Sequence, residues 1–266
     1  SSTTSSTLAN AAITARSKTY INNASATSFT TQGGDVLLAS NIDDATDNDT
    51  TTNGYIQFSS GLTITTNGGN ITLGGGDATA SGYALGTSAY PFEGIRADGT
   101  INLNSGGGAI VMRGKSYAAN TTWASWGMGF WALTTGAINS GTGTILLDGF
   151  SQSSGSTYSP ALFSNGALTI TSANTTADAI RMIGKSTGIS GDAWGIEAES
   201  ALSVLATGDG GGITISTSQQ VADNYDAVFR GETNILAKNG PIQLLGKQDG
   251  DRKSTRLNSS HDQRSR

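Results

Sequence analysis

One short strand pattern recurs seven times along this chain and limits its possible folds more than any other feature. Each copy alternates apolar and mixed residues, is usually entered by glycine, and has a second apolar residue two positions after the first. The copies are GDVLL at 34–38, GNITL at 69–73, GAIVM at 108–112, GTILL at 143–147, AIRM at 179–182, GITI at 212–215 and PIQLL at 241–245. Because the intervening residues include Arg181 and Gln243, each strand is expected to bury only one face.

Two further short strands precede most copies of this pattern. Four repeats align there without gaps, as YIQFSSGLTI at 55–64, GIRADGTINL at 94–103, ALFSNGALTI at 161–170 and GIEAESALSV at 195–204. The repeat that contains GFWALTTGAINSGTGTILL at 129–147 is looser, and its second strand is not placed. The repeat unit therefore has three short strands and recurs about every 35 residues.

A single coil of three strands cannot bury its apolar face, but stacked coils can. Coils about 4.8 Å apart pair their backbones, and equivalent Ile, Leu and Val side chains form ladders inside the stack. The pattern predicts an all-β fold, a parallel β-helix (β-solenoid) with three short strands per coil, about 35 residues per repeat and about seven coils. Residues 1–250 are expected to form this β-helix as one repeat region.

Composition agrees with a turn-rich β fold. The chain has 37 glycines among 266 residues, roughly twice the average share. Its formal net charge of −5 argues against nucleic acid or an anionic membrane as the main partner. No apolar run approaches the roughly 18 residues that a membrane-spanning helix needs, so insertion of this segment into a membrane is not expected.

The last 16 residues differ from the rest. Residues 251–266 read DRKSTRLNSSHDQRSR and lose both the glycines and the alternation. The run from Asp251 to His261 resembles the translation of a common sequencing adapter, so we interpret 251–266 as an artefactual, disordered tail. The β-helix is then expected to be a fragment that is open at both ends. Residues 1–250 contain neither histidine nor cysteine, which excludes Ser/His triads and zinc sites built on His or Cys from that stretch.

Segments such as GLTITTNGGNITL at 61–73 and GTINLNSGGGAIVM at 99–112 are similar to the repeat region of filamentous-haemagglutinin-type adhesins and related autotransporter passengers. The similarity is one of repeat style and covers nearly all of residues 1–250. It implies a right-handed β-helix that is exported across the outer membrane by a partner β-barrel and is located outside the cell, on the bacterial surface. It also implies adhesion through a receptor or glycan on a host or neighbouring cell. Neither the secretion domain nor a receptor-binding motif of that family is visible.

We therefore expect a non-enzymatic stalk or adhesive segment of a large secreted bacterial surface protein. Its excursions between repeats present loops for attachment to cells, surfaces or glycans. The aromatic residues of these excursions, and one just beyond them, are the candidate contacts. They are Tyr117, Trp123, Trp126, Trp131, Tyr158 and Trp194. The alternative role for the tryptophans is to cover the outer wall of the β-helix.

A β-helical polysaccharide lyase or glycoside hydrolase is the main alternative class, because such enzymes need carboxylates that converge on one face. Glu197 and Glu199 point the same way on one predicted strand. Asp98 and Asn165 share a column of the repeat alignment with Glu199. That column leads into a turn, where Asp and Asn are expected for structural reasons. No catalytic residue is therefore assigned.

Two other patterns are weaker. GKS occurs at 114–116 and 184–186, but the first glycine of a phosphate-binding loop is Ala109 or Ala179 here and no helix is expected to follow. We interpret both copies as strand-ending turns. NIDDATDNDT at 41–50 and GGGDA at 74–78 are rich in calcium-type ligands but lack the required spacing. They are interpreted as solvated loops, so neither a metal ion nor a cofactor is predicted.

Overall fold

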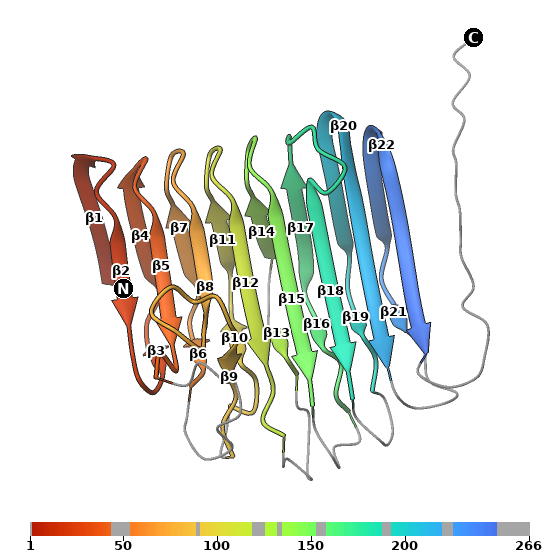
Figure 1. The fold of residues 1–266 in the computed structure, drawn as a ribbon, viewed down its shortest axis with the longest axis horizontal. Coiled ribbons are helices and arrows are strands. Elements are labelled where there is room, and N and C mark those ends of the chain that lie inside the picture. Colours follow the sequence, from red (N-terminus) through yellow and green to blue (C-terminus); the bar gives the residue numbers. More distant parts are fainter. Residues whose placement is uncertain are drawn as a thin grey trace.

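The chain folds as a parallel β-solenoid (Figure 1). The computed structural model describes residues 2–43, 54–88, 91–118, 126–131, 135–152, 158–187, 193–219 and 226–248. Within these ranges there is no helix, and thus none that could cross a membrane. Stacked strands are separated by about 34 residues. The predicted all-β class, parallel stacking and repeat length are therefore confirmed.

Three columns of strands run along the solenoid. The first column contains β1 (Ser2–Ala9), β4 (Thr27–Gln32), β7 (Leu62–Thr65), β11 (Ile101–Asn104), β14 (Thr135–Asn139), β17 (Ala167–Ser172) and the first parts of β20 (Leu202–Gln219) and β22 (Thr233–Gln248). The second contains β2 (Ile13–Arg16), β5 (Val36–Ser40), β8 (Ile71–Gly75), β12 (Ile110–Lys115), β15 (Ile145–Ser151), β18 (Ile180–Ser186) and the later parts of β20 and β22. These two columns form one sheet of 15 strands, which also includes β9 (Ala84–Leu85) from an excursion.

The third column is a separate sheet of seven strands. It contains β3 (Ile21–Asn23), β6 (Ile56–Phe58), β10 (Ile95–Asp98), β13 (Met128–Trp131), β16 (Leu162–Ser164), β19 (Ile196–Ala198) and β21 (Ala227–Phe229). The strand left unplaced in the looser repeat is β14. It has two inward positions. The second is held by the buried Ile138, but the first is held by Gly136, which pairs with Ile101 and Leu168, so one of the two apolar residues of the pattern is missing there.

The repeated apolar residues form the predicted ladders. In the second column the register pairs the first apolar residue of each strand with its equivalent in the next coil. This ladder consists of Val36, Ile71, Ile110, Ile145, Ile180 and Ile213, each at most 1% exposed. Burying one such side chain stabilises the fold by roughly 1.5 to 3 kcal/mol. The alternating strand pattern therefore forms the core of the solenoid.

The prediction of about seven coils is somewhat off. About five turns have a closed interior, running from β6–β8 to β19–β20, where the inward residues of all three columns are buried. In the rungs at the two ends, inward residues such as Ile21 and Ile235 are only partly buried, because a neighbouring coil covers them on one side only. Two of the seven recurring strands belong to these end rungs.

A turn with buried hydroxyl groups links the first column to the second. Thr66 lies five residues before Ile71 of the apolar ladder. Its hydroxyl donates to the carbonyl of Gly69 within its own turn. The same hydroxyl also donates to Ser105 O in the next coil, at 3.1 Å. Thr31 and Ser105 repeat both contacts one coil to either side. The turn therefore satisfies its buried carbonyl groups from within and ties successive coils together.

Glycines stack beside these hydroxyl groups. A Cβ atom added to Gly69 would lie 2.2 Å from the carbonyl oxygen of Gly34, one at Gly108 would lie 2.1 Å from that of Gly69, and one at Gly143 would lie 2.0 Å from that of Gly108. The four strands β5, β8, β12 and β15 are thus entered by glycine because the coil below leaves no room for a side chain. We call Gly34, Gly69, Gly108 and Gly143 the glycine ladder.

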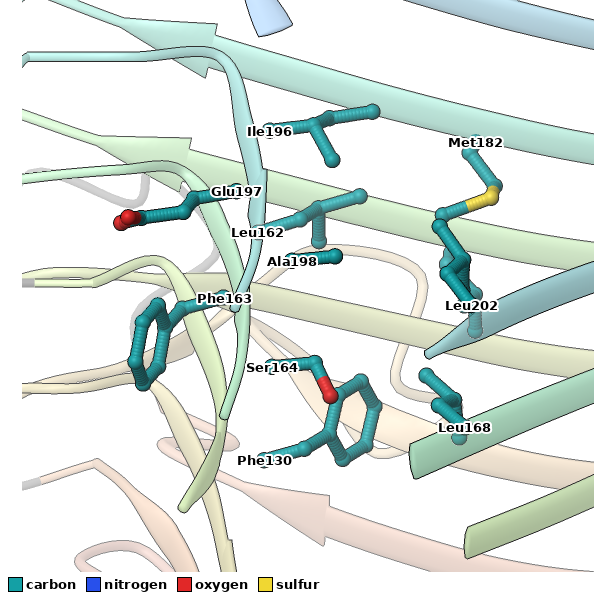
Figure 2. Close-up of a pocket in the computed structure, with 11 residues that line it drawn as sticks. Phe130, Leu162, Phe163, Ser164, Leu168, Met182, Ile196, Glu197, Ala198 and Leu202 are labelled. Atoms are coloured by element: carbon teal, nitrogen blue, oxygen red, sulfur yellow. The ribbon is translucent and has the colours of Figure 1, made fainter. Parts of the chain in front are cut away.

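The inward face of the third column contains a packing defect. Its second ladder runs Phe58, Ala97, Phe130, Ser164, Ala198 and Phe229. Two small residues follow one another at Ser164 and Ala198, and a cavity of about 20 Å³ lies next to them. Figure 2 shows both side chains pointing into the interior on the same side of their strands as Phe130, toward Leu168 and Leu202 across the core. The cavity holds about one water-sized group and is too small for an organic ligand.

Filling this cavity is expected to stabilise the protein. Ala198→Val should raise the free energy of unfolding by about 1 kcal/mol, because the added methyl groups occupy empty apolar space. Ala97→Val is the matched control, since Ala97 is flanked by the rings of Phe58 and Phe130. It should lower the free energy of unfolding by about 1 to 3 kcal/mol through overpacking. Urea titration of both variants measures the difference, and equal effects would contradict the cavity argument.

Candidate functional site

The outer face of the third column collects most of the predicted aromatic residues that the structure describes. The strand positions that face away from the core there are paired in register and are occupied by Gln57, Arg96, Gly129, Phe163, Glu197 and Val228. Phe163 and Glu197 are each only 1% exposed, although Figure 2 shows them on the side of the strands opposite to the core. A second layer of side chains must therefore cover this face.

The excursions supply the covering layer. Glu93, Trp126 and Trp194 each lie two residues before a strand of the third column. Because they hold the same place in successive repeats, the solenoid brings them to the same outer face. Trp126 is 2% exposed and Trp194 is 4% exposed.

Four rings form a continuous cluster in this layer. Trp126 stacks on Phe163 with ring centroids 4.2 Å apart and an interplanar angle of 25°. Tyr158 meets Trp126, Phe163 and Trp194 edge to face, at centroid distances of 6.2, 5.8 and 5.9 Å. Gly129 makes room for the stack, since a Cβ atom there would lie 2.4 Å from Cε3 of Trp126. We call Trp126, Tyr158, Phe163 and Trp194 the aromatic cluster.

Ionic groups border the cluster at one end. The Arg96 guanidinium donates to Glu93 Oε1 at 2.9 Å and pairs with Asp98 Oδ1 at 3.0 Å, and it lies 5.9 Å from the ring centroid of Trp126. Burial raises the pKa of Glu93, and the positive charge of Arg96 opposes that rise. Glu93 Oε2 has no hydrogen-bond partner within the described part of the chain.

A second ionic group borders the opposite end. Glu197 accepts a short hydrogen bond from the Tyr158 hydroxyl and another from Arg230 Nε at 3.1 Å. The Arg230 guanidinium lies 5.2 Å from the ring centroid of Trp194. Burial is the main cause that raises the pKa of Glu197, while its hydrogen bonds from Tyr158 and Arg230 lower it. Burial and the Glu197 hydrogen bond likewise raise the pKa of Tyr158.

The raised pKa of Glu197 predicts how stability depends on pH. A carboxyl group whose pKa is higher in the folded chain binds its proton more tightly when folded. Its stabilising contribution is therefore present at low pH and is lost as the pH rises from the unfolded value, about 4.3 for Glu, through the raised folded value. Glu197→Gln should reduce the fall in the free energy of unfolding that accompanies a rise in pH above about 4.3, as measured by urea titration.

The control for this experiment is Glu199→Gln, which removes a negative charge from an exposed neighbour. We expect this variant to keep most of the wild-type pH dependence. An identical pH dependence in wild type and Glu197→Gln would contradict the role assigned to burial of the Glu197 carboxyl group.

The structure brings together three of the six predicted contact residues, Trp126, Tyr158 and Trp194. Tyr117 lies elsewhere, just after β12, where its backbone N–H donates to Phe92 O at 3.0 Å. Trp131 belongs to β13, and its backbone pairs with that of Asp98. Trp123 lies outside the described residues. For Trp126 and Trp194 the burial favours the covering role over contact with glycans.

Sequence reasoning missed several residues of this layer. Arg96 and Phe163 were not considered, although they occupy the same alignment column as Glu197 in the repeats at 94–103, 161–170 and 195–204. A large or charged residue recurs at this outward strand position, and that recurrence could have indicated a covered outer face. Glu93, Gly129 and Arg230 differ in residue type from the residues at the equivalent places of neighbouring repeats, so the sequence offered no comparable indication for them.

The carboxylates considered for catalysis do not form one shared site. Asp98 is paired with Arg96, and Glu197 is held by Tyr158 and Arg230. Glu199, just after β19, is exposed. Both GKS copies lie at the ends of β12 and β18, and their glycines, Gly114 and Gly184, are both paired with Gly149 of β15. The structural interpretation therefore fits, but these residues belong to the last part of the strands and not to turns as expected.

The structure describes some of the aspartates in the two segments that are rich in calcium-type ligands. Asp43 lies 3.7 Å from the Lys18 ammonium group, and the remaining aspartates of 41–50 lie outside the described residues. Asp77 accepts hydrogen bonds from the hydroxyl groups of Thr79 and Ser81, which hold its pKa below the usual range. Across the described ranges, no group of three or more His, Cys, Asp or Glu residues is placed to hold a metal ion.

The fold and this layer define a class, a parallel β-solenoid repeat protein with side-chain clusters packed on its outer wall. No family model, curated protein or solved structure matches the chain.

Proposed function

We propose that this chain is a structural, adhesive segment of a large secreted bacterial surface protein. Its solenoid, which we infer to be right-handed, serves as a stalk over residues 1–250, outside the cell. Loops on the stalk attach to receptors or glycans on cells or other surfaces, and a partner β-barrel in the outer membrane exports the whole protein. The segment needs neither a cofactor nor a metal ion for this role, and it is not an enzyme.

The observation that carries this proposal is the aromatic cluster. The excursions return to the outer wall through buried rings, with Trp126 stacked on Phe163 and Tyr158 packed between Trp126 and Trp194. Such packing fastens each excursion at the point where it rejoins a strand. Rigid anchoring of variable loops on a regular frame suits a protein that presents binding surfaces.

The ionic groups next to the rings support the same role. Glu93, Arg96 and Asp98 bind one another, and Glu197 is bound by Tyr158 and Arg230. A polysaccharide-cleaving enzyme instead needs acid and base groups that can reach a sugar. The carboxylates of this wall are largely engaged in internal contacts, which favours a scaffold over an enzyme.

The test is to incubate the full chain with cells and with a panel of neutral and uronic-acid polysaccharides, and to measure both binding and cleavage. We expect binding to at least one surface or glycan and no change in polysaccharide length. Cleavage that disappears in Asp98→Asn or Glu199→Gln, but persists in the exposed-residue control Asp209→Asn, would overturn the proposal in favour of a β-helical lyase or hydrolase.

A further inference from the structure

A group of basic side chains lies on the outer face of the second column, away from the aromatic cluster. Three adjacent strands, β12, β15 and β18, carry it, and the register places their outward residues side by side. We call this group the basic patch. It consists of Arg113, Lys115, Asp148, Phe150, Arg181 and Lys185. Three exposed or partly exposed cations, Arg113, Arg181 and Lys185, thus share this face with the buried Lys115 and with one carboxylate, on a chain whose formal net charge is −5.

Phe150 organises the centre of the patch. The Lys185 ammonium group lies 4.7 Å and the Lys115 ammonium group 5.5 Å from the centroid of its ring. The register places Lys115 on the strand to one side of Phe150 and Lys185 on the strand to the other side. Cation–π attraction therefore helps to hold two positive charges, one from each neighbouring strand, close to the ring.

The single carboxylate of the patch is already engaged. Asp148 Oδ2 accepts a hydrogen bond of 3.0 Å from the Tyr83 hydroxyl, and Tyr83 also packs edge to face against Phe150. Asp148 lies opposite Arg113 in the register, and Arg181 lies on the next strand opposite Leu146, two residues before the position that pairs with Asp148. One partly buried carboxylate cannot neutralise the surrounding cations.

Three cations of the patch form no ion pair with any residue in the described ranges. The ion pairs there involve Lys18, Arg96 and Arg230 instead. Arg181 and Lys185 are exposed, and Arg113 is partly exposed. An exposed cluster of like charges repels itself, so an anionic partner would relieve a cost that the folded chain carries.

We propose that the basic patch binds an acidic polysaccharide through its uronate carboxylate groups, with the polymer lying along the solenoid axis. This inference deepens the proposed function, on which it rests, by naming the glycan class and by placing the contact on a strand face rather than on a loop.

The geometry favours a polymer over a single small anion. Arg113 and Arg181 lie on strands two rungs apart, which corresponds to about 10 Å between their backbones. One carboxylate cannot bridge that distance, whereas linked carboxylates can bind both sites at once and gain from multivalency. Arginine also offers a planar fork of donors that matches a carboxylate.

The rest of the molecule favours a polysaccharide over nucleic acid or an anionic membrane. Those partners carry dense charge, and a chain with a net charge of −5 repels them over most of its surface. A uronic-acid chain has neutral hydroxyl groups between its charges, so it can follow a narrow basic strip along a protein that is otherwise acidic.

The experiment measures binding of fluorescently labelled polygalacturonate oligomers to the full chain by fluorescence anisotropy. The patch variant is Arg113→Gln with Arg181→Gln and Lys185→Gln. The control variant, Arg16→Gln with Lys18→Gln and Lys238→Gln, removes the same charge from positions outside the patch. We expect about tenfold or greater weakening in the patch variant, less than about twofold change in the control, and weaker binding as salt increases. Circular dichroism checks that both variants fold.

Some results would overturn the inference, and others would separate it from the proposed function. Absence of polygalacturonate binding, or equal weakening in the two variants, would show that the patch does not recognise this polymer. Tighter binding of single-stranded DNA or of vesicles with anionic lipids through the same three residues would assign the patch to another class of partner.

If the patch variant loses polygalacturonate but still attaches to cells, the proposed adhesive function and the patch contribute separately. If the wild type binds polygalacturonate but attaches to no cell or surface, the patch inference holds and the broader function fails.

Discussion

Gly69→Ala is expected to lower the free energy of unfolding by about 3 kcal/mol, the upper end of the usual cost of overpacking. The reason is steric, because the new Cβ atom would lie 2.2 Å from the carbonyl oxygen of Gly34. Neither group can move away alone, since both belong to the paired backbone of the coils. The two coils would have to separate locally and lose hydrogen bonds. Urea titration monitored by circular dichroism measures the loss.

The adjacent residue provides the matched control. Gly68 has φ +117°, and a Cβ atom there would meet nothing within 4 Å. Gly68→Ala should therefore cost only the backbone strain of an unfavourable φ, about 1 kcal/mol. Equal losses in Gly68→Ala and Gly69→Ala would contradict the claim that contact between coils, rather than backbone freedom, requires the glycine ladder.

Trp126→Ala is expected to lower the free energy of unfolding by about 3 to 5 kcal/mol, as is usual when a buried large aromatic side chain is truncated. The Trp126 ring is buried against Phe163, Tyr158 and Gly129, so its removal leaves a void in the covering layer. Thermal unfolding and urea titration of the variant measure this loss.

Tyr20→Ala is the control for Trp126→Ala, because it removes a stacked ring that is not buried. Tyr20 stacks on Tyr55 at a centroid distance of 5.0 Å, yet it is 47% exposed. Its truncation should cost about 1 kcal/mol or less, because little apolar surface leaves water there. If Trp126→Ala left stability unchanged but abolished attachment to glycans, the covering role assigned to Trp126 would be wrong.

The coil itself was predictable because its signal is repeated. Ile71, Ile110 and Ile145 each occupy the same place in the repeat, and one alternating strand defines which face is buried in every copy. The repeat length and parallel stacking followed from that spacing. The first rung was missed because β1 reads STTSSTLA, a polar sequence in which the apolar alternation is absent.

The outer layer was predictable only in part, since it depends on how excursions of different lengths return to the wall. The sequence identified Trp126, Tyr158 and Trp194 as notable aromatics. That Trp126 would stack on Phe163 depends on the path of the preceding excursion and on the space above Gly129. No periodic signal encodes such a path.

The turn hydroxyl groups and the glycine ladder have a consequence for how such a solenoid changes in length. Each coil meets its neighbours through the same small set of contacts, as when Thr66 donates to Ser105 O above it and Thr31 donates to Thr66 O below it. Any coil that keeps a small hydroxyl residue and a glycine at these two positions offers the same upper and lower surfaces. Whole repeats could therefore be duplicated or deleted by recombination without redesign of the remainder, so the reach of the protein can evolve in steps of one coil.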